Sequence, residues 1–280
     1  MPADSMHGSS GSSGSSASSG APSAAPLVFI TGASSGIGQA LAARFHRAGY
    51  RLALVARRAA EVEAWARTAA FNRSSYAVYA ADVRDIAAIT GAGRACIASQ
   101  GLPDVVIANA GISVGIDTAV YADLEVMRAV YETNNIGLAA TFQPFVAPMA
   151  ARRSGALVGI ASVAGIRGMP GHGAYCSSKA AAISYCESLR GEMRPAGVKV
   201  VTLLPGYVDT PLTRGNRYRM PFLMRAETFA DKAYAAIVTG TGYRVIPWQM
   251  GIAAKLLRAL PNALFDRLLA GRPRKQRRAE

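Results

Sequence analysis

The chain has 280 residues, of which 51% are hydrophobic and 17% charged, and its formal net charge is +14. This apolar content excludes a disordered chain. Three cysteines are too few for a disulfide scaffold, and none lies in a C-x-x-C pair typical of zinc or redox sites. We therefore expect free thiols, a reducing, cytoplasmic compartment and no metal site.

Residues 1–26 are mostly Ser, Gly, Ala and Pro, a composition typical of a flexible coil. They lack the basic and apolar regions of a secretory signal. We expect one catalytic domain over residues 27–250, followed by an amphipathic, basic tail over residues 251–280.

Apolar runs and helical patterns alternate along this domain. Strands are expected at residues 27–30, 51–56, 76–80, 104–108, 156–161, 198–204 and 243–246. Helices are expected at residues 37–48, 61–70, 86–100, 122–151, 174–193 and 230–238, with Pro144 and Pro148 bending or ending the fourth.

Strands that alternate with helices require crossover connections, and these strands are continuous apolar runs rather than alternating ones. The sequence therefore predicts an α/β fold: a single Rossmann-type, doubly wound parallel sheet of about seven strands with helices on both faces. No apolar run approaches the ~18 residues that would span a bilayer.

A glycine-rich turn follows the first strand and opens the first helix. Its spacing is G-x-x-x-G-x-G, and its residues are Thr31, Gly32, Ser34, Ser35, Gly36, Ile37 and Gly38. Glycines at such a turn let a pyrophosphate approach the backbone, and the helix start offers it unpaired N–H groups. This context predicts a dinucleotide site.

Arg57 and Arg58 follow the second strand, where an NAD site usually carries an acid. A guanidinium pairs with a 2′-phosphate, which an acid would repel. The cofactor expected is therefore NADP(H) rather than NAD(H).

Together, these motifs resemble the classical short-chain dehydrogenases/reductases over most of the chain. The matching residues are Thr31-Gly32-x-x-x-Gly36-Ile37-Gly38, Asn109-Ala110-Gly111, Ser162, Tyr175-x-x-x-Lys179 and Pro205-Gly206. The resemblance implies hydride transfer between the cofactor and a substrate carbon.

The residues themselves support that chemistry. Tyr175 and Lys179 lie one helical turn apart, and a nearby ammonium is expected to lower the pKa of a phenol from its usual value of about 10. Tyr175 can then act as general acid or base. The Ser162 hydroxyl follows a strand and can hydrogen-bond the substrate oxygen.

The remaining site residues are carried over from the resemblance. Asn134, in an N-x-x-G segment, is expected to hold a water that links Lys179 to solvent, with Asn135 as the alternative. Lys179 is also expected to bond the nicotinamide ribose. The other expected cofactor contacts are Asp82, Val83, Asn109, Ala110, Gly111, Tyr175, Pro205, Gly206, Val208 and Thr210.

Two segments bear on substrate and partners. Residues 212–228, at the position of the family's variable substrate loop, mix apolar side chains with arginines, which suits a lipophilic substrate and can also meet an anionic group. Residues 252–269 predict two amphipathic helices, and a basic run follows them. This tail is compatible with peripheral contact to an anionic membrane, with a cap over the substrate site, or with packing in an oligomer.

We expect an NADP(H)-dependent oxidoreductase that interconverts a carbonyl and an alcohol on a lipophilic small molecule and forms a homodimer or homotetramer. The alternative is an NADP(H)-binding sensor without turnover. No nucleic-acid-binding motif accompanies the basic charge, so no nucleic-acid partner is expected. His172 and Cys176 flank Tyr175 but are interpreted as a loop histidine and a packed thiol.

Overall fold

The computed structural model describes residues 25–216, 218–271 and 273–277. Most of the Ser/Gly-rich segment predicted to be a flexible coil, residues 1–24, lies outside this part of the chain, as do Arg217 and two arginines of the terminal basic run, Arg272 and Arg278.

A seven-stranded sheet forms the centre of the molecule, and every neighbouring pair of strands in it is parallel. The strand order is β3-β2-β1-β4-β5-β6-β9. Its strands are β1 (Leu27–Thr31), β2 (Arg51–Ala56), β3 (Tyr76–Ala80), β4 (Val105–Ala108), β5 (Ala156–Ile160), β6 (Lys199–Pro205) and β9 (Tyr243–Ile246). The predicted doubly wound sheet is confirmed.

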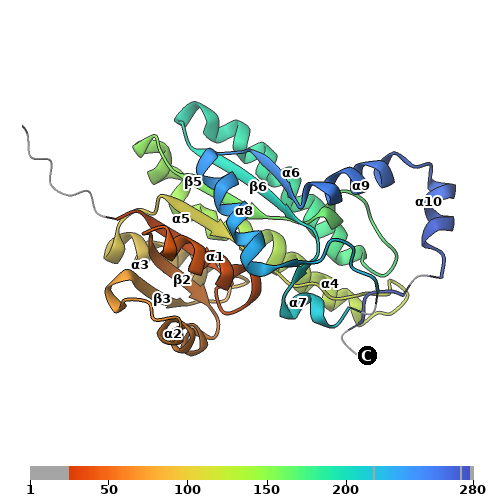
Figure 1. The fold of residues 1–280 in the computed structure, drawn as a ribbon, viewed down its shortest axis with the longest axis horizontal. Coiled ribbons are helices and arrows are strands. Elements are labelled where there is room, and N and C mark those ends of the chain that lie inside the picture. Colours follow the sequence, from red (N-terminus) through yellow and green to blue (C-terminus); the bar gives the residue numbers. More distant parts are fainter. Residues whose placement is uncertain (1–24, 217, 272, 278–280) are drawn as a thin grey trace, which may run out of the picture.

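Helices cover both faces of the sheet (Figure 1). They are α1 (Gly36–Arg47), α2 (Ala59–Thr68), α3 (Ile86–Gln100), α4 (Asp123–Tyr131), α5 (Gly137–Arg152), α6 (Gly173–Met193), α7 (Pro211–Arg214), α8 (Ala226–Thr239), α9 (Trp248–Ala259) and α10 (Asn262–Leu269). Strands β7 (Val208–Asp209) and β8 (Met224–Arg225) form a separate small sheet next to α7.

Two hydrophobic cores lie on opposite faces of the sheet. Along β1, Val28 and Ile30 pack in one core with α1, α2 and α8, whereas Leu27 and Phe29 pack in the other with α3, α5 and α6. This alternation follows from the period of two of a β-strand. It explains why the strands read as continuous apolar runs.

The long helix expected over residues 122–151 is divided. A π-helical turn, Glu132–Ile136, separates α4 from α5. Pro144 and Pro148, expected to bend or end the helix, lie inside α5 and do not end it. The π turn places Asn134 within a helical segment whose backbone hydrogen-bond pattern is altered.

In the part of the chain that the structure describes, none of the helices combines the length and the apolar character needed to cross a membrane.

Candidate active site

The glycine-rich turn connects β1 to α1 at the carboxyl end of the sheet. Gly32 and Gly36 have φ values of +69° and +57°, a region that favours glycine. A side chain at Gly38 would collide with the carbonyl of Gly32, so the start of α1 packs closely on the turn. The first turn of α1 carries no acidic residue, and Ser35 makes no side-chain cap. The first N–H groups therefore remain available for an anion.

Thr31 and Asn109 hold the ends of β1 and β4 together. The Thr31 hydroxyl accepts hydrogen bonds from the backbone N–H groups of Asn109 (3.1 Å) and Ala110 (3.2 Å). The Asn109 amide donates to the carbonyl of Thr31 at 2.9 Å. Both side chains are expected to bind cofactor, and in the structure they hold together the strand ends that form the base of the site.

A cleft of about 590 Å³ crosses the carboxyl ends of the central strands. Most of the residues expected to bind cofactor line this cleft: Gly32, Ser34, Ser35, Gly36, Ile37, Arg57, Arg58, Asp82, Val83, Asn109, Ala110, Gly111, Tyr175, Lys179, Pro205, Gly206, Val208 and Thr210. Thr31, Gly38 and Asn134 lie behind its wall rather than on it. Glycines in the floor and an open helix start fit a dinucleotide lying along the cleft.

Positive side chains gather at the β2 end of the cleft. Arg57 lies 3.9 Å from the Asp82 carboxylate, and Arg58 pairs with Glu61 at 3.0 Å. Arg84, which the sequence analysis missed, also lines the cleft and pairs with Asp82 at 2.7 Å. Its hydrogen bond keeps the pKa of Asp82 below the usual range. The signal for Arg84 was present, because it directly follows Asp82 and Val83.

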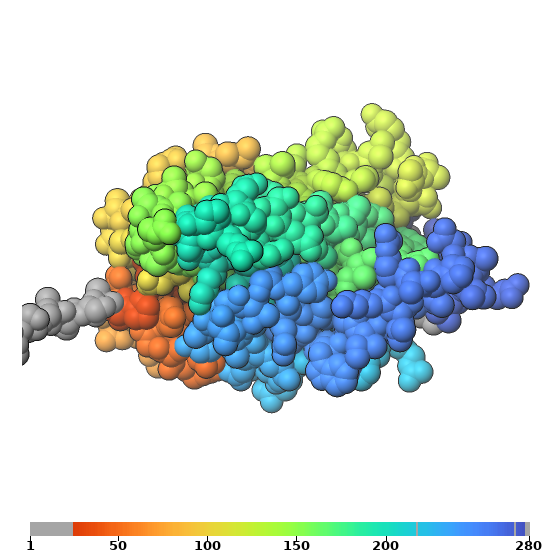
Figure 2. Space-filling view, turned by 90° about the horizontal axis from the view of Figure 1, so that it is seen from above, coloured from red at the N-terminus to blue at the C-terminus, as the bar shows by residue number. Residues whose placement is uncertain are grey.

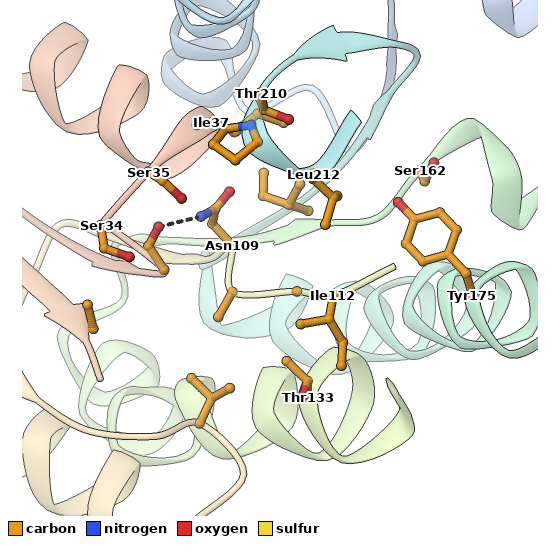
Figure 3. Close-up of a pocket in the computed structure, with 18 of the residues that line it drawn as sticks. Ser34, Ser35, Ile37, Asn109, Ile112, Thr133, Ser162, Tyr175, Thr210 and Leu212 are labelled. Carbon is orange, nitrogen blue, oxygen red and sulfur yellow. Dashed lines mark hydrogen bonds between the residues drawn. The ribbon is translucent and has the colours of Figure 1, made fainter. Parts of the chain in front are cut away.

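Tyr175 and Ser162 meet at the other end of the cleft. Tyr175 comes from α6 and Ser162 from the loop after β5, and Figure 3 shows the phenolic oxygen directed toward the serine. Burial raises the pKa of Tyr175, and the hydrogen bond with Ser162 partly opposes that effect. The Ser162 oxygen also accepts a hydrogen bond from the Ala164 N–H at 3.2 Å.

Lys179 lies close to Tyr175, and the expected lowering of the Tyr175 pKa by its ammonium stays a prediction. The Lys179 Nζ lies 5.9 Å from the centre of the Tyr175 ring and donates a hydrogen bond to the carbonyl of Ile160 at 2.8 Å. Burial lowers the pKa of Lys179 to about 8. Desolvation therefore dominates both groups.

Asn134 is buried beneath the cleft in the π-helical turn. Its Oδ1 accepts from the Ile112 N–H at 2.9 Å, and its Nδ2 donates to the Ile112 carbonyl and to the Ser178 hydroxyl. A Cβ at Gly111 would lie 3.2 Å from that Oδ1 and 3.4 Å from Lys179 Nζ. Gly111 thus permits Asn134 and Lys179 to approach each other.

Asn135, the alternative to Asn134, faces a different environment. Its Nδ2 donates to the carbonyl of Ser178 at 2.8 Å, while its buried Oδ1 has no hydrogen-bond partner among the described residues. The Asn134 Oδ1 and the Lys179 Nζ both lie near the Gly111 Cα, so the geometry favours Asn134 for the expected role.

His172 and Cys176 are both buried. The His172 ring nitrogens contact the Pro170 carbonyl (3.1 Å) and the Tyr218 hydroxyl (3.3 Å), and burial lowers the pKa of His172. Burial also raises the pKa of Cys176, so its thiol is not activated as a nucleophile.

A family model described as short chain dehydrogenase matches residues 26–220. A protein of Myxococcus xanthus (strain DK1622) named as an uncharacterized oxidoreductase is 37% identical over 237 residues, which cover 85% of this chain and 93% of that protein.

Solved structures have the same fold. A short-chain dehydrogenase from Sphingobium yanoikuyae in complex with NADPH aligns with a TM-score of 0.71 and 25% identity, covering 85% of this chain and 97% of that one. A short-chain dehydrogenase/reductase from Burkholderia phymatum in complex with NAD aligns with a TM-score of 0.75 and 23% identity, covering 83% and 92%.

Proposed function

Because this chain belongs to the short-chain dehydrogenase family of oxidoreductases, we propose that it uses NADP(H) to interconvert a carbonyl and an alcohol on a lipophilic small molecule. The observation that carries the proposal is the meeting of Tyr175 and Ser162 at one end of a long cleft whose other end is lined by Arg57, Arg58 and Arg84.

In the direction of reduction, Tyr175 gives its proton to the substrate oxygen while the Ser162 hydroxyl hydrogen-bonds the same oxygen. When bound, the nicotinamide supplies or accepts the hydride. Burial favours the protonated phenol, which is the form that this step requires. Lys179 bonds the cofactor ribose, and Asn134 supports a water that connects Lys179 to solvent.

The proposal of NADP(H) over NAD(H) rests on charge. Arg57 and Arg58 follow β2 where an acid would select the unphosphorylated ribose, and both are well exposed to a ligand in the cleft. One related structure is described with NAD and another with NADPH. The proposal of NADP(H) for this chain therefore depends on its own arginines.

A lipophilic substrate is supported by the rim of the cleft. Leu212 lines it, and Phe222 and Leu223 in the following loop are about half exposed. Apolar side chains on the cleft and in the loop that follows suit an apolar substrate body.

We further propose that α9 contacts an anionic membrane peripherally. We also propose that the protein is cytoplasmic and forms a homodimer or homotetramer. Trp248, Ile252 and Leu256 repeat every four residues and are 61%, 50% and 65% exposed, with Lys255 and Arg258 beside them. An exposed apolar stripe next to basic residues is typical of helices that lie on lipid.

Consumption of NADPH against ketones and aldehydes of graded lipophilicity tests the proposed reaction. We expect turnover that rises with the apolar length of the carbonyl compound. Tight NADPH binding without turnover on any carbonyl would instead favour the alternative, an NADP(H) sensor.

A further inference from the structure

The C-terminal end of the chain folds back onto the rim of the active-site cleft. We call residues 273–277 the C-terminal strap. The backbone carbonyl of Gln276 accepts a hydrogen bond from the Gly115 N–H at 2.9 Å, and Arg277 forms a parallel β-bridge with Gly115. Figure 1 shows this segment returning from α10 toward α7 and α4. The strap therefore lies against Gly115, which directly follows Val114 in the lining of the cleft.

A partly buried ion pair anchors the strap. Arg277 donates to both carboxylate oxygens of Asp123, at 2.7 and 3.2 Å, and the Asp123 side chain is only 7% exposed. The same carboxylate accepts the Asp117 N–H at 2.7 Å. Two bonds from one guanidinium fix orientation as well as position. This pairing sets where the neighbouring residues of the strap lie.

The space around Gly171 also fits the strap. Gly171 has a φ of +74°, and a Cβ there would lie 2.8 Å from the Cβ of Arg274. The absence of a side chain at Gly171 therefore lets the strap lie against the loop that precedes α6 and Tyr175.

Lys275 lies between these anchors and turns its ammonium toward α7. Its Nζ donates to the Asn216 Oδ1 at 2.5 Å and to the Leu212 carbonyl at 3.3 Å. Burial lowers the pKa of Lys275. An ammonium that is partly withdrawn from water and whose acceptors among the described residues are neutral is destabilised, and a negative charge beside it would offset that cost.

No carboxylate among the described residues pairs with Lys275. The acidic side chains nearest the strap already have arginine partners: Asp123 pairs with Arg277, and Asp117 lies 4.0 Å from Arg274. Within α7 and its approach, Asp209 pairs with Arg214 at 3.4 Å. Among the described residues, these three acids thus pair with arginines rather than with Lys275.

The position of Lys275 relates it to the reacting end of the cleft. Leu212, whose carbonyl it bonds, lines the same cleft as Tyr175 and Ser162. Tyr218 contacts His172 at 3.3 Å, and the nearby Tyr175 contributes, after burial, to raising the pKa of Tyr218. Lys275 also acts electrostatically on His172. The Lys275 ammonium thus lies close enough to His172 to affect its titration, and His172 contacts Tyr218.

We propose that the C-terminal strap is part of the substrate site and that Lys275 binds an anionic group of the substrate, a carboxylate or a phosphate, at a distance from the carbonyl that reacts. This deepens the proposed function, on which it rests for the location of the reacting carbon. Lys275 is then a specificity-determining residue, and Asp123 positions it through Arg277.

Binding of unreactive probes tests the proposal without requiring turnover. We would measure, by calorimetry on the full chain with NADP⁺ present, the affinities of octanoate, octyl phosphate and the neutral octanamide. We expect one of the two anions to bind at least about tenfold more tightly than the amide, a ratio typical of one charge-assisted hydrogen bond. The anion with the higher affinity identifies the group.

Variants assign that preference to Lys275. K275Q is expected to reduce the anion-to-amide affinity ratio to near 1, K275R to keep most of it, and K232Q, on the exposed face of α8, to leave it unchanged. Because the ratio is taken within each variant, partial loss of folded protein cancels. Equal affinity for all three probes in the wild type, or a preference retained in K275Q, would overturn the proposal.

The anchor provides a second test. D123N removes the charge partner of Arg277, and we expect it to lower the anion preference and to increase amide exchange in residues 273–277. Increased exchange with an unchanged preference would contradict a role of the strap in the substrate site. Failure of the carbonyl assay would count against the proposed reaction alone, since these affinities are measured without it.

Discussion

Lys179 donates a hydrogen bond from its Nζ to the carbonyl of Ile160 at 2.8 Å, which fixes α6 against the end of β5. The side chain is 4% exposed, and burial lowers its pKa to about 8. An ammonium at this position is therefore held at the expense of stability, as is common for groups kept in an active site.

This gives a prediction for the pH dependence of unfolding. Between pH 8 and about pH 10.4, the unfolded chain keeps the Lys179 proton while the folded chain loses it, so the free energy of unfolding rises with pH. The rise attributable to Lys179 is at most roughly 3 kcal/mol.

Urea unfolding of the wild type and K179M, without cofactor, measures this contribution of Lys179 to the free energy of unfolding. We expect K179M to be the more stable protein at pH 7 and its advantage to shrink as the pH rises to 10. An advantage that is constant with pH would show that Lys179 titrates normally.

Because α1 packs closely on the glycine-rich turn, one added methyl group at Gly38 should strongly affect stability and cofactor binding. At Gly38 a Cβ would meet the Gly32 carbonyl and lie 2.6 Å from the Asn109 amide, so G38A should lower stability and abolish cofactor binding. At Gly91, in α3, a Cβ meets nothing within 4 Å, so G91A should stabilise the protein by up to about 1 kcal/mol. Thermal unfolding measures the stability of both variants, and NADPH fluorescence measures cofactor binding. Normal NADPH binding by G38A would contradict the packing described.

Cofactor choice should respond to the arginines after β2. R57S together with R58S is expected to weaken NADPH binding roughly 10- to 100-fold, as expected for the loss of charge-assisted hydrogen bonds, and to change NADH binding little. R67S, in helix α2, which follows these arginines, serves as the control because Arg67 does not line the cleft. An equal loss of affinity for NADPH and NADH would mean that these arginines do not bind the 2′-phosphate.

Contact of α9 with lipid can be followed by fluorescence. The chain has two tryptophans, Trp65 and Trp248, so a W65F background isolates the signal of Trp248. We expect its emission to shift to the blue with phosphatidylglycerol vesicles and less with phosphatidylcholine vesicles. An unchanged spectrum with anionic vesicles at low salt would refute membrane contact by this helix.

The sheet and the motif positions could be predicted from the sequence because they depend on local signals. Continuous apolar runs mark strands buried on both faces, and the expected strand at residues 243–246 matches β9. The π-helical turn around Asn134 could not be predicted in this way, because the helical periodicity of residues 122–151 hides one altered turn.

Features that depend on the tertiary fold were beyond the sequence. The spacing of Tyr175 and Lys179 could not reveal that both groups are buried, which raises the pKa of Tyr175 and lowers that of Lys179. A cap over the substrate site was one of three alternatives for the tail, but the sequence could not select it, because Arg277 and Asp123 are 154 residues apart. In the described part of the terminal basic run, Arg274, Lys275 and Arg277 contact the rim of the cleft.

Figure 2 shows the helices of the C-terminal part along one side of the molecule, with the last of them projecting at its end. The domain boundary expected at residue 250 falls inside α9, which begins at Trp248 directly after β9. Arg167, from the loop that follows Ser162, donates to the carbonyls of Leu257 and Arg258 at 2.7 and 2.8 Å. The tail is thus tied to the catalytic loop rather than appended to the domain.

The most direct test of the central claim is NADPH oxidation by the wild type and by Tyr175→Phe with the best carbonyl substrate. We predict that the variant binds NADPH with nearly wild-type affinity and loses at least about 100-fold in kcat, because it keeps the ring and lacks the proton. Turnover by Tyr175→Phe at close to the wild-type rate would contradict the assignment of Tyr175 as the proton donor.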